Sequence, residues 1–167
     1  NELVQQVNGE FAERFESRNL DLICILQPEP LLIRADSRRI WRVLENLYVN
    51  VCKYAMPGTR VYVDAIKKDG KIQFSIKNIS ENPLNFQADE LTERFIRGDV
   101  SRSTEGSGLG LSIAKNLTVL QHGSFNIYLD GDLFKVTITF DEAVKEKKPM
   151  PPMIVPEAVQ EEAQQDA

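Results

Sequence analysis

Residues 36–54 read DSRRIWRVLENLYVNVCKY, and this stretch decides the fold. Asp36 is placed to cap the amino end of a helix, and Pro57-Gly58 interrupts the pattern beyond its carboxyl end. The apolar residues recur at intervals of three and four, the period of an amphipathic helix: Ile40, Val43, Leu44, Leu47, Val51 and Tyr54. The stretch therefore predicts a long helix with one apolar face.

Two hairpins follow this helix. Residues 60–67 and 71–77 alternate apolar and polar side chains around Lys68-Asp69-Gly70. Residues 124–129 and 133–140 flank the turn Asp130-Gly131-Asp132. Alternation with period two is typical of strands with one face on a core, so these segments predict one sheet.

Shorter elements precede the helix. A four-residue spacing over 3–15 predicts an amphipathic helix with Leu3, Val7, Phe11 and Phe15 on one face. Residues 20–26 and 31–33 are apolar runs separated by Gln27-Pro28-Glu29-Pro30, and we expect two short strands.

Between the hairpins, residues 80–107 are polar and almost without periodicity, which is typical of a functional loop. Residues 108–120 return to helical spacing and end at His122-Gly123. Beyond Asp141 the chain is rich in Lys, Glu, Gln and Pro, so we expect a disordered tail over 142–167.

Composition limits the classes of function. A formal net charge of -5 argues against a nucleic-acid partner. Cys24 and Cys52 lie in apolar stretches without metal-ligand spacing, which indicates reduced, buried thiols. No apolar run approaches the roughly 20 residues that cross a bilayer, and no signal peptide opens the chain. We expect a soluble piece of a longer protein.

Two features carry chemistry. Asn46, Asn50 and Lys53 form one polar stripe along the long helix, suited to magnesium-bound phosphates or simply to solvent. In Glu105-Gly106-Ser107-Gly108-Leu109-Gly110-Leu111, three alternating glycines run into a helix, where backbone N–H groups can approach phosphate oxygens. Such a run serves as a hinge about as often as it binds a ligand, and it matches neither the P-loop nor the dinucleotide-binding spacing.

Together these features resemble the ATP-binding catalytic domain of bacterial sensor histidine kinases. Residues 45–55 (ENLYVNVCKYA) are similar to the N box, 93–99 (ERFIRGD) to the F box and 106–111 (GSGLGL) to the G2 box, in the same order and separation. The resemblance covers roughly residues 36–140. It implies an α/β two-layer sandwich of the GHKL type, with a mixed sheet packed on helices and ATP held under a flexible lid.

The resemblance also assigns roles. Asn50 would hold Mg2+ at the ATP phosphates with help from Asn46, Lys53 would contact phosphate, and Tyr54 would pack by the adenine. Arg97 would reach the terminal phosphate, a task that suits a guanidinium. Gly106, Ser107, Gly108 and Gly110 would form the phosphate-binding segment, with Leu109 and Leu111 packed beneath the helix. Asn46, Asn50 and Arg97 are thus the expected catalytic residues, and ATP and Mg2+ the expected ligands.

One position departs from the family pattern. The G1 box usually reads Asp-x-Gly-x-Gly, with an aspartate that accepts a hydrogen bond from the adenine amino group. Here Asn78 stands in place of the aspartate, and both glycines are missing. The side-chain carbonyl of an asparagine still accepts a hydrogen bond, although a neutral bond is weaker than a charge-assisted one. Asn78 could also merely end its strand in an Asx turn.

The resemblance leaves the phosphoacceptor outside the chain. His122 is the only histidine, lies at the end of a helix, and has no acidic neighbour of the phosphoacceptor type. We therefore expect residues 1–19 to be a helix and linker from a missing dimerisation domain and 20–141 to be the catalytic domain. That dimerisation domain and a response regulator are the expected partners. We expect this piece to be monomeric and cytoplasmic, and its parent to be membrane-anchored.

Two other functions remain open. A nucleotide-binding regulatory module could have lost kinase activity through the altered G1 region. A gyrase- or MutL-like ATPase is the second, but such hydrolases resemble one another in having a glutamate where this chain has Asn46.

Overall fold

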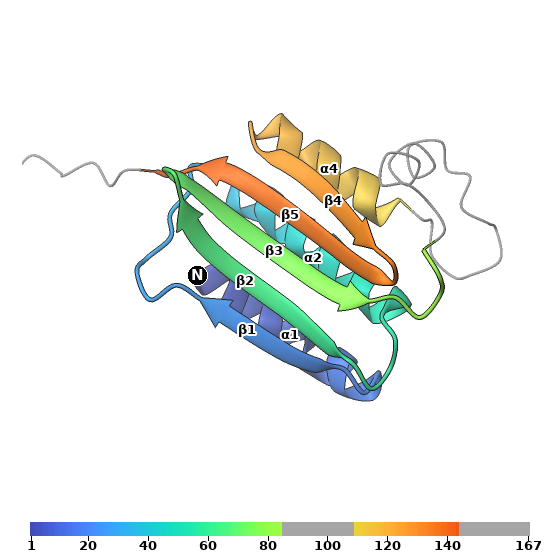
Figure 1. Cartoon of the computed structure of the whole chain (residues 1–167). Helices are drawn as coiled ribbons and strands as arrows, with labels where there is room; N and C mark the ends of the chain where they lie inside the picture. The colour runs from blue at the N-terminus through green and yellow to red at the C-terminus, as the bar shows by residue number, and fades with distance from the viewer. Residues whose placement is uncertain (85–108, 144–167) are drawn as a thin grey trace, which may run out of the picture.

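The computed structural model describes residues 1–84 and 109–143. It shows a five-stranded sheet with helices on one face (Figure 1). The elements in chain order are α1 (Glu2–Ser17), β1 (Asp21–Leu26), α2 (Ser37–Tyr54), β2 (Arg60–Lys68), β3 (Lys71–Ile79), α4 (Gly110–Leu120), β4 (Ser124–Asp130) and β5 (Leu133–Asp141).

The sheet is mixed, as the sequence predicts. Its order is β1-β2-β3-β5-β4, with β1 parallel to β2 and the remaining neighbours antiparallel. The two predicted hairpins, β2–β3 and β4–β5, lie side by side because β3 pairs with β5. Among the described residues, the helices lie behind the sheet and none covers its front face (Figure 1). The two-layer α/β prediction is confirmed.

Helix α2 lies at the centre of the helical layer. The side chain of Asp36 caps it by accepting hydrogen bonds from the backbone N–H groups of Arg38 at 2.9 Å and Arg39 at 3.1 Å. The predicted apolar face is buried from Ile40 to Val51, with Val43 and Leu47 almost without exposed surface. The prediction is wrong for Tyr54, which is 36% exposed because it is the last residue of the helix. Tyr48, which the periodicity analysis left out, is also fully buried. This helix faces the inner side of the sheet and positions the stripe of polar residues beside it.

Helix α1 belongs to the same core. Val7, Phe11 and Phe15 are buried with the α2 and sheet residues in one cluster. The ring of Phe15 stacks on that of Tyr48 with centroids 5.7 Å apart, and the Tyr48 hydroxyl donates a hydrogen bond to Asn8 Oδ1. The amphipathic helix is therefore confirmed, whereas its assignment to a different domain stays a prediction.

Two predictions from the amino-terminal part are wrong. Residues 31–33 form no strand, and only an isolated bridge joins Ile33 to Glu142, because Pro28 and Pro30 interrupt the backbone before this segment. Cys24 is exposed rather than buried, because β1 is the last strand of the sheet and nothing described packs against its outer edge. Cys52 is partly buried, and both thiols are free.

Helix α4 ends at the predicted place. His122 adopts a left-handed conformation with φ of 64°, and the backbone N–H of Gly123 donates to the carbonyl of Thr118 at 3.0 Å. Gly123 is required for a different reason: a Cβ there would lie 2.6 Å from the Phe140 ring. None of the described helices has the length and hydropathy needed to cross a membrane. The predicted loop of 80–107 and the tail lie largely outside the described residues.

Candidate nucleotide-binding site

The polar stripe of α2 lies at the side of the helix that meets α4. Asn46 and Asn50 are partly buried, while Lys53 and Tyr54 are exposed near the carboxyl end. The predicted spacing of four and three residues thus places three polar groups along one flank of a helix whose opposite face is in the core. Among the described residues, this flank is only partly buried.

The start of α4 lies against this stripe. A Cβ built on Gly110 would lie 3.2 Å from Oδ1 of Asn46, so a side chain here would press on the asparagine amide. Asn46 is held in place because its Nδ2 donates to the carbonyl of Arg42 at 2.7 Å. The structure therefore brings the N-box match and the G2-box match together, which no sequence spacing could show.

The leucines flanking Gly110 differ from one another. Leu111 is 3% exposed and packs in the core, as predicted. Leu109 is 38% exposed, so the prediction that it packs beneath the helix is wrong. The reason is its position: Leu109 is the N-cap residue of α4, one step before the helical turn that turns Leu111 inward.

Asn78 lies on the face of β3 that points toward the helices. It is 3% exposed and follows Phe74 and Ile76 along the same face. Its Nδ2 donates to the carbonyl of Ile79 at 3.1 Å. Its Oδ1 is buried and has no hydrogen-bond partner among the residues the structure describes. A buried acceptor without a donor costs free energy and is expected to have a partner in the functional state.

The carboxyl ends of α2 and β3 are joined by backbone hydrogen bonds. Met56 N–H donates to the carbonyl of Ile79 at 2.9 Å, and Glu81 N–H donates to that of Tyr54 at 2.8 Å. These bonds hold the carboxyl end of α2, which carries Lys53, next to the end of β3, which carries Asn78.

Arg18 reinforces this junction, and the sequence analysis did not select it. The Nη2 of Arg18 donates to the carbonyl of Ala55 at 3.3 Å and to Oε2 of Glu81 at 3.0 Å. It thereby joins the end of α1 to the ends of α2 and β3. No sequence signal marks this arginine, because its partners lie 37 and 63 residues away.

Burial controls the ionisable groups behind the stripe. Desolvation raises the pKa of the Cys52 thiol to about 11, although Arg14 and Arg18 lower it. Burial also raises the pKa of the Tyr48 phenol, with a smaller contribution from Cys24. Both groups stay neutral at physiological pH and serve packing rather than proton transfer.

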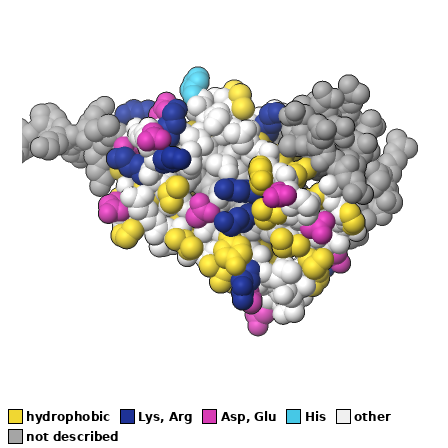
Figure 2. All heavy atoms as spheres, viewed as in Figure 1, with side chains coloured by type: hydrophobic (Ala, Val, Ile, Leu, Met, Phe, Trp, Pro, Cys, Tyr) yellow, Lys and Arg dark blue, Asp and Glu magenta, His cyan; other side chains and the backbone are white. Residues whose placement is uncertain are grey.

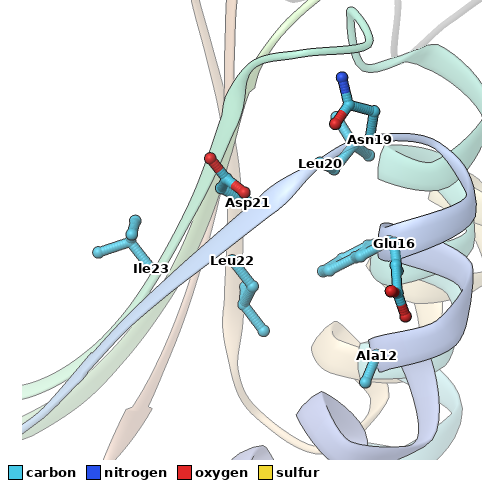
Figure 3. A pocket seen from close by; sticks show the side chains of 8 residues that line it. Ala12, Glu16, Asn19, Leu20, Asp21, Leu22 and Ile23 are labelled. Carbon is cyan, nitrogen blue, oxygen red and sulfur yellow. The ribbon is translucent and has the colours of Figure 1, made fainter.

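Four predicted site residues lie outside the described part of the chain: Arg97, Gly106, Ser107 and Gly108. Among residues 1–84 and 109–143, no three His, Cys, Asp or Glu side chains gather as a metal site. A pocket of about 490 Å3 between α1 and β1 is lined by Phe15, Glu16 and Asp21 but includes none of the predicted site residues (Figure 3). The candidate site is the junction of α2, β3 and α4, because the predicted site residues that the structure describes lie on these three elements.

These groups suit a planar base joined to phosphates. Asn78 offers a buried acceptor at one end, and the amides of Asn46 and Asn50 with the ammonium of Lys53 offer polar contacts at the other. The amino-terminal end of α4 lies beside Asn46 and favours negative charge.

Comparison with known proteins identifies the family. The family model described as "Histidine kinase-, DNA gyrase B-, and HSP90-like ATPase" matches residues 35–144. The chain is 31% identical over 123 residues to the signal transduction histidine-protein kinase BaeS of Escherichia coli, covering 72% of this chain and 26% of that protein. It is 29% identical over 129 residues to the sensor histidine kinase RppB of Synechocystis, covering 76% and 28%. The chain thus spans about a quarter of the length of these relatives.

Solved structures show the same fold. The catalytic domain of histidine kinase ThkA superposes with a TM-score of 0.73 at 24% identity, covering 85% of this chain and 91% of that one. Full-length ShkA in complex with AMPPNP gives a TM-score of 0.69 at 23% identity, covering 85% and 30%. The matched family, the kinase relatives and the shared fold lead to one conclusion: the chain belongs to the histidine kinase-, DNA gyrase B- and HSP90-like ATPases, as an ATP-binding catalytic domain of the sensor histidine kinase type.

Proposed function

We propose that this domain binds Mg-ATP and transfers the γ-phosphate to a histidine on a separate dimerisation domain of its parent kinase. Family membership supports the reaction class. The observation that carries the proposal is the buried, unpartnered Oδ1 of Asn78 at the junction of α2 and β3.

Asn78 explains how the altered G1 region still recognises adenine. Its Nδ2 is engaged by the Ile79 carbonyl, so the side-chain oxygen is the end left for a ligand. The 6-amino group of adenine is a donor that matches this oxygen, whereas guanine presents a carbonyl oxygen at the same position. Asn78 therefore favours ATP over GTP through a neutral hydrogen bond.

The phosphates belong to the other end of the site. We assign them to the stripe of Asn46, Asn50 and Lys53, with Asn50 supplying an amide oxygen to magnesium and Gly110 keeping the approach to Asn46 open. Magnesium, when bound, neutralises phosphate charge. The assigned contacts of Tyr54 with adenine, of Arg97 with the terminal phosphate, and of Gly106, Ser107 and Gly108 with phosphate stay predictions.

The chemistry required of this chain is positioning and charge neutralisation. Phosphoryl transfer depends chiefly on the alignment of donor and acceptor, so the domain needs no strong general base. The acceptor histidine and a response regulator are proposed partners, and the complex of ThkA with the response regulator TrrA is consistent with the second. Membrane anchoring of the parent is likewise a proposal.

Calorimetric titration with ATP, with and without magnesium, tests the binding step, and GTP serves as the control for the base. We expect magnesium-dependent binding that prefers ATP and is lost in Asn50→Ala. Mixing the chain with its upstream domain is then expected to yield acid-labile phosphohistidine.

The outcomes separate the possible functions. Nucleotide binding without phosphotransfer would indicate a regulatory module, which the missing G1 glycines would explain. Glu45, next to Asn46, is the one candidate for a base in the N-box match. Steady hydrolysis by the isolated chain, lost on changing Asn46 or Glu45, would indicate an ATPase. Absence of binding at millimolar nucleotide would refute the proposal.

A further inference from the structure

Strand β1 forms one edge of the sheet and pairs only with β2 among the described elements. Edge strands of monomeric proteins are usually protected by lysine, proline, bulges or shortness, because their unpaired backbone groups recruit further strands. The five residues after Asp21 carry no charge and no proline, and Ile23 and Ile25 are 38% and 62% exposed. Apart from its length of six residues, this edge lacks the usual protection.

The opposite edge of the same sheet is different. On β4 the exposed positions alternate with partly buried ones and are mostly polar, namely Ser124, Asn126 and Asp130, with Tyr128 as the exception. The β4 edge therefore exposes mainly polar side chains, whereas the β1 edge exposes isoleucine side chains. Figure 2 shows hydrophobic side chains at the surface toward the β1 side of the front face.

The β1 sequence is a palindrome, Leu22-Ile23-Cys24-Ile25-Leu26, centred on Cys24. Two copies paired antiparallel about a two-fold axis at Cys24 would place Ile23 opposite Ile25 of the partner subunit. Leu22 would then lie opposite Leu26 of the partner subunit. Residues directly opposite one another lie on the same face, so this register matches apolar side chains on both faces of the joined sheet.

Charge does not oppose this register. Asp21 is the only charged residue of β1, and it would lie opposite Gln27 of the partner subunit rather than another carboxylate. Leu22 and Ile23 point to opposite sides of the strand, and Leu22 lines the pocket of about 490 Å3 beside α1 (Figure 3). Leu26 of the partner subunit would lie next to Leu22 at this pocket.

We infer that β1 is a self-association edge through which two copies of this chain join into a continuous ten-stranded sheet. The partner is a second copy because a palindromic strand without internal charge complements itself in the antiparallel register. One short strand from each copy forms a small interface, so the association is weak and concentration dependent. The sequence alone predicts a monomer, and the structure points to a different state at high local concentration.

Sedimentation of the full chain under reducing conditions tests the inference. The average mass is expected to rise with concentration toward twice the monomer mass. Ile25→Lys places a charge at an exposed edge position and is expected to weaken association by about tenfold or more. Tyr128→Lys is the matched control, because Tyr128 is 54% exposed on the other edge strand, and it should associate like the wild type. A wild-type chain that stays monomeric at millimolar protein would overturn the inference. Equal association of the wild type and of Ile25→Lys would overturn it as well.

Cross-linking provides an independent test that needs no destabilising variant. Antiparallel partners lie about 4.5–5.5 Å apart at Cα, within the range for a disulfide, so the two Cys24 thiols at the axis should join when diamide removes their two hydrogens. The covalent dimer is expected in wild type and Cys52→Ser, but not in Cys24→Ser or Ile25→Lys. A dimer that persists in Cys24→Ser, or none in wild type, contradicts the register. Neither experiment depends on nucleotide binding.

Discussion

Asn78 shows how one residue can serve a ligand at a cost to the free chain. Its oxygen is buried without a donor, while its nitrogen is engaged by Ile79. The carbonyl of Ile79 also accepts from Met56 N–H, so it keeps a partner if Asn78 is replaced. Stability and ligand affinity should therefore respond in opposite directions to an apolar substitution.

Asn78→Leu is expected to leave the nucleotide-free chain as stable as wild type or up to about 1 kcal/mol more stable, because an unsatisfied buried acceptor is removed. Affinity for ATP should fall about tenfold, the value of one hydrogen bond. Urea denaturation and calorimetry measure the two quantities. Asn126→Leu, on the exposed face of β4, is the control and should leave ATP affinity unchanged. Loss of stability with unchanged affinity would assign Asn78 a purely structural role.

Gly110 provides a second test at this scale. Gly110→Ala places a methyl group 3.2 Å from Asn46 Oδ1, so the asparagine must move, and affinity for Mg-ATP is expected to fall several-fold. Stability should change by less than about 1 kcal/mol, because alanine favours the helix. Gly9→Ala is the matched control: no atom lies within 4 Å of a Cβ there, and the variant should gain about 0.5–1 kcal/mol without any change in binding. Equal affinities of the two variants for Mg-ATP would show that Gly110 does not belong to the binding site.

At the scale of elements, α1 is the helix whose assignment matters most. Its buried side chains pack on Tyr48 of α2, and Arg18 at its end holds Ala55 and Glu81. A helix that merely linked two domains would leave the stability of the catalytic unit almost unchanged when its apolar face is damaged.

Phe15→Ala is therefore expected to destabilise the chain by about 3–5 kcal/mol, the usual range for deleting a buried phenylalanine ring. Denaturant unfolding followed by circular dichroism measures the change. Glu16→Ala, on the exposed side of the same helical turn, should change stability by less than about 0.5 kcal/mol. A similar small effect of Phe15→Ala would favour the predicted boundary at residue 20.

At the scale of the whole molecule, the buried neutral Cys52 thiol and Tyr48 phenol lower the stability of the folded chain at high pH. The Cys52 thiol has a pKa of about 11 in the folded chain against an ordinary 9.0, and burial also raises the pKa of the Tyr48 phenol. An unfolded chain releases these protons first, so stability is intact below pH 9 and declines as pH rises toward the folded values.

Unfolding free energies measured from pH 7 to about 11 should therefore fall above pH 9 in wild type. In Cys52→Ala the unfolding free energy should decline less steeply between pH 9 and 11 than in wild type, by the equivalent of up to one released proton. Below pH 9 the two pH dependences should not differ. Ser124→Ala, at an exposed and non-ionisable side chain of β4, is the control and should follow the wild-type slope. Parallel curves for wild type and Cys52→Ala would show that the Cys52 thiol titrates normally.

The sequence by itself determined α2, its cap at Asp36, both hairpins and the family, because helical and strand periods and the three boxes are local patterns. It placed Leu109 and Cys24 wrongly, because burial depends on what packs against a residue and not on the polarity of its neighbours in the chain. Only the tertiary structure decided that Gly110 lies on Asn46, that Asn78 keeps a free acceptor and that β1 is an open edge. Each of these follows from contacts between residues far apart in the chain, which no local pattern encodes.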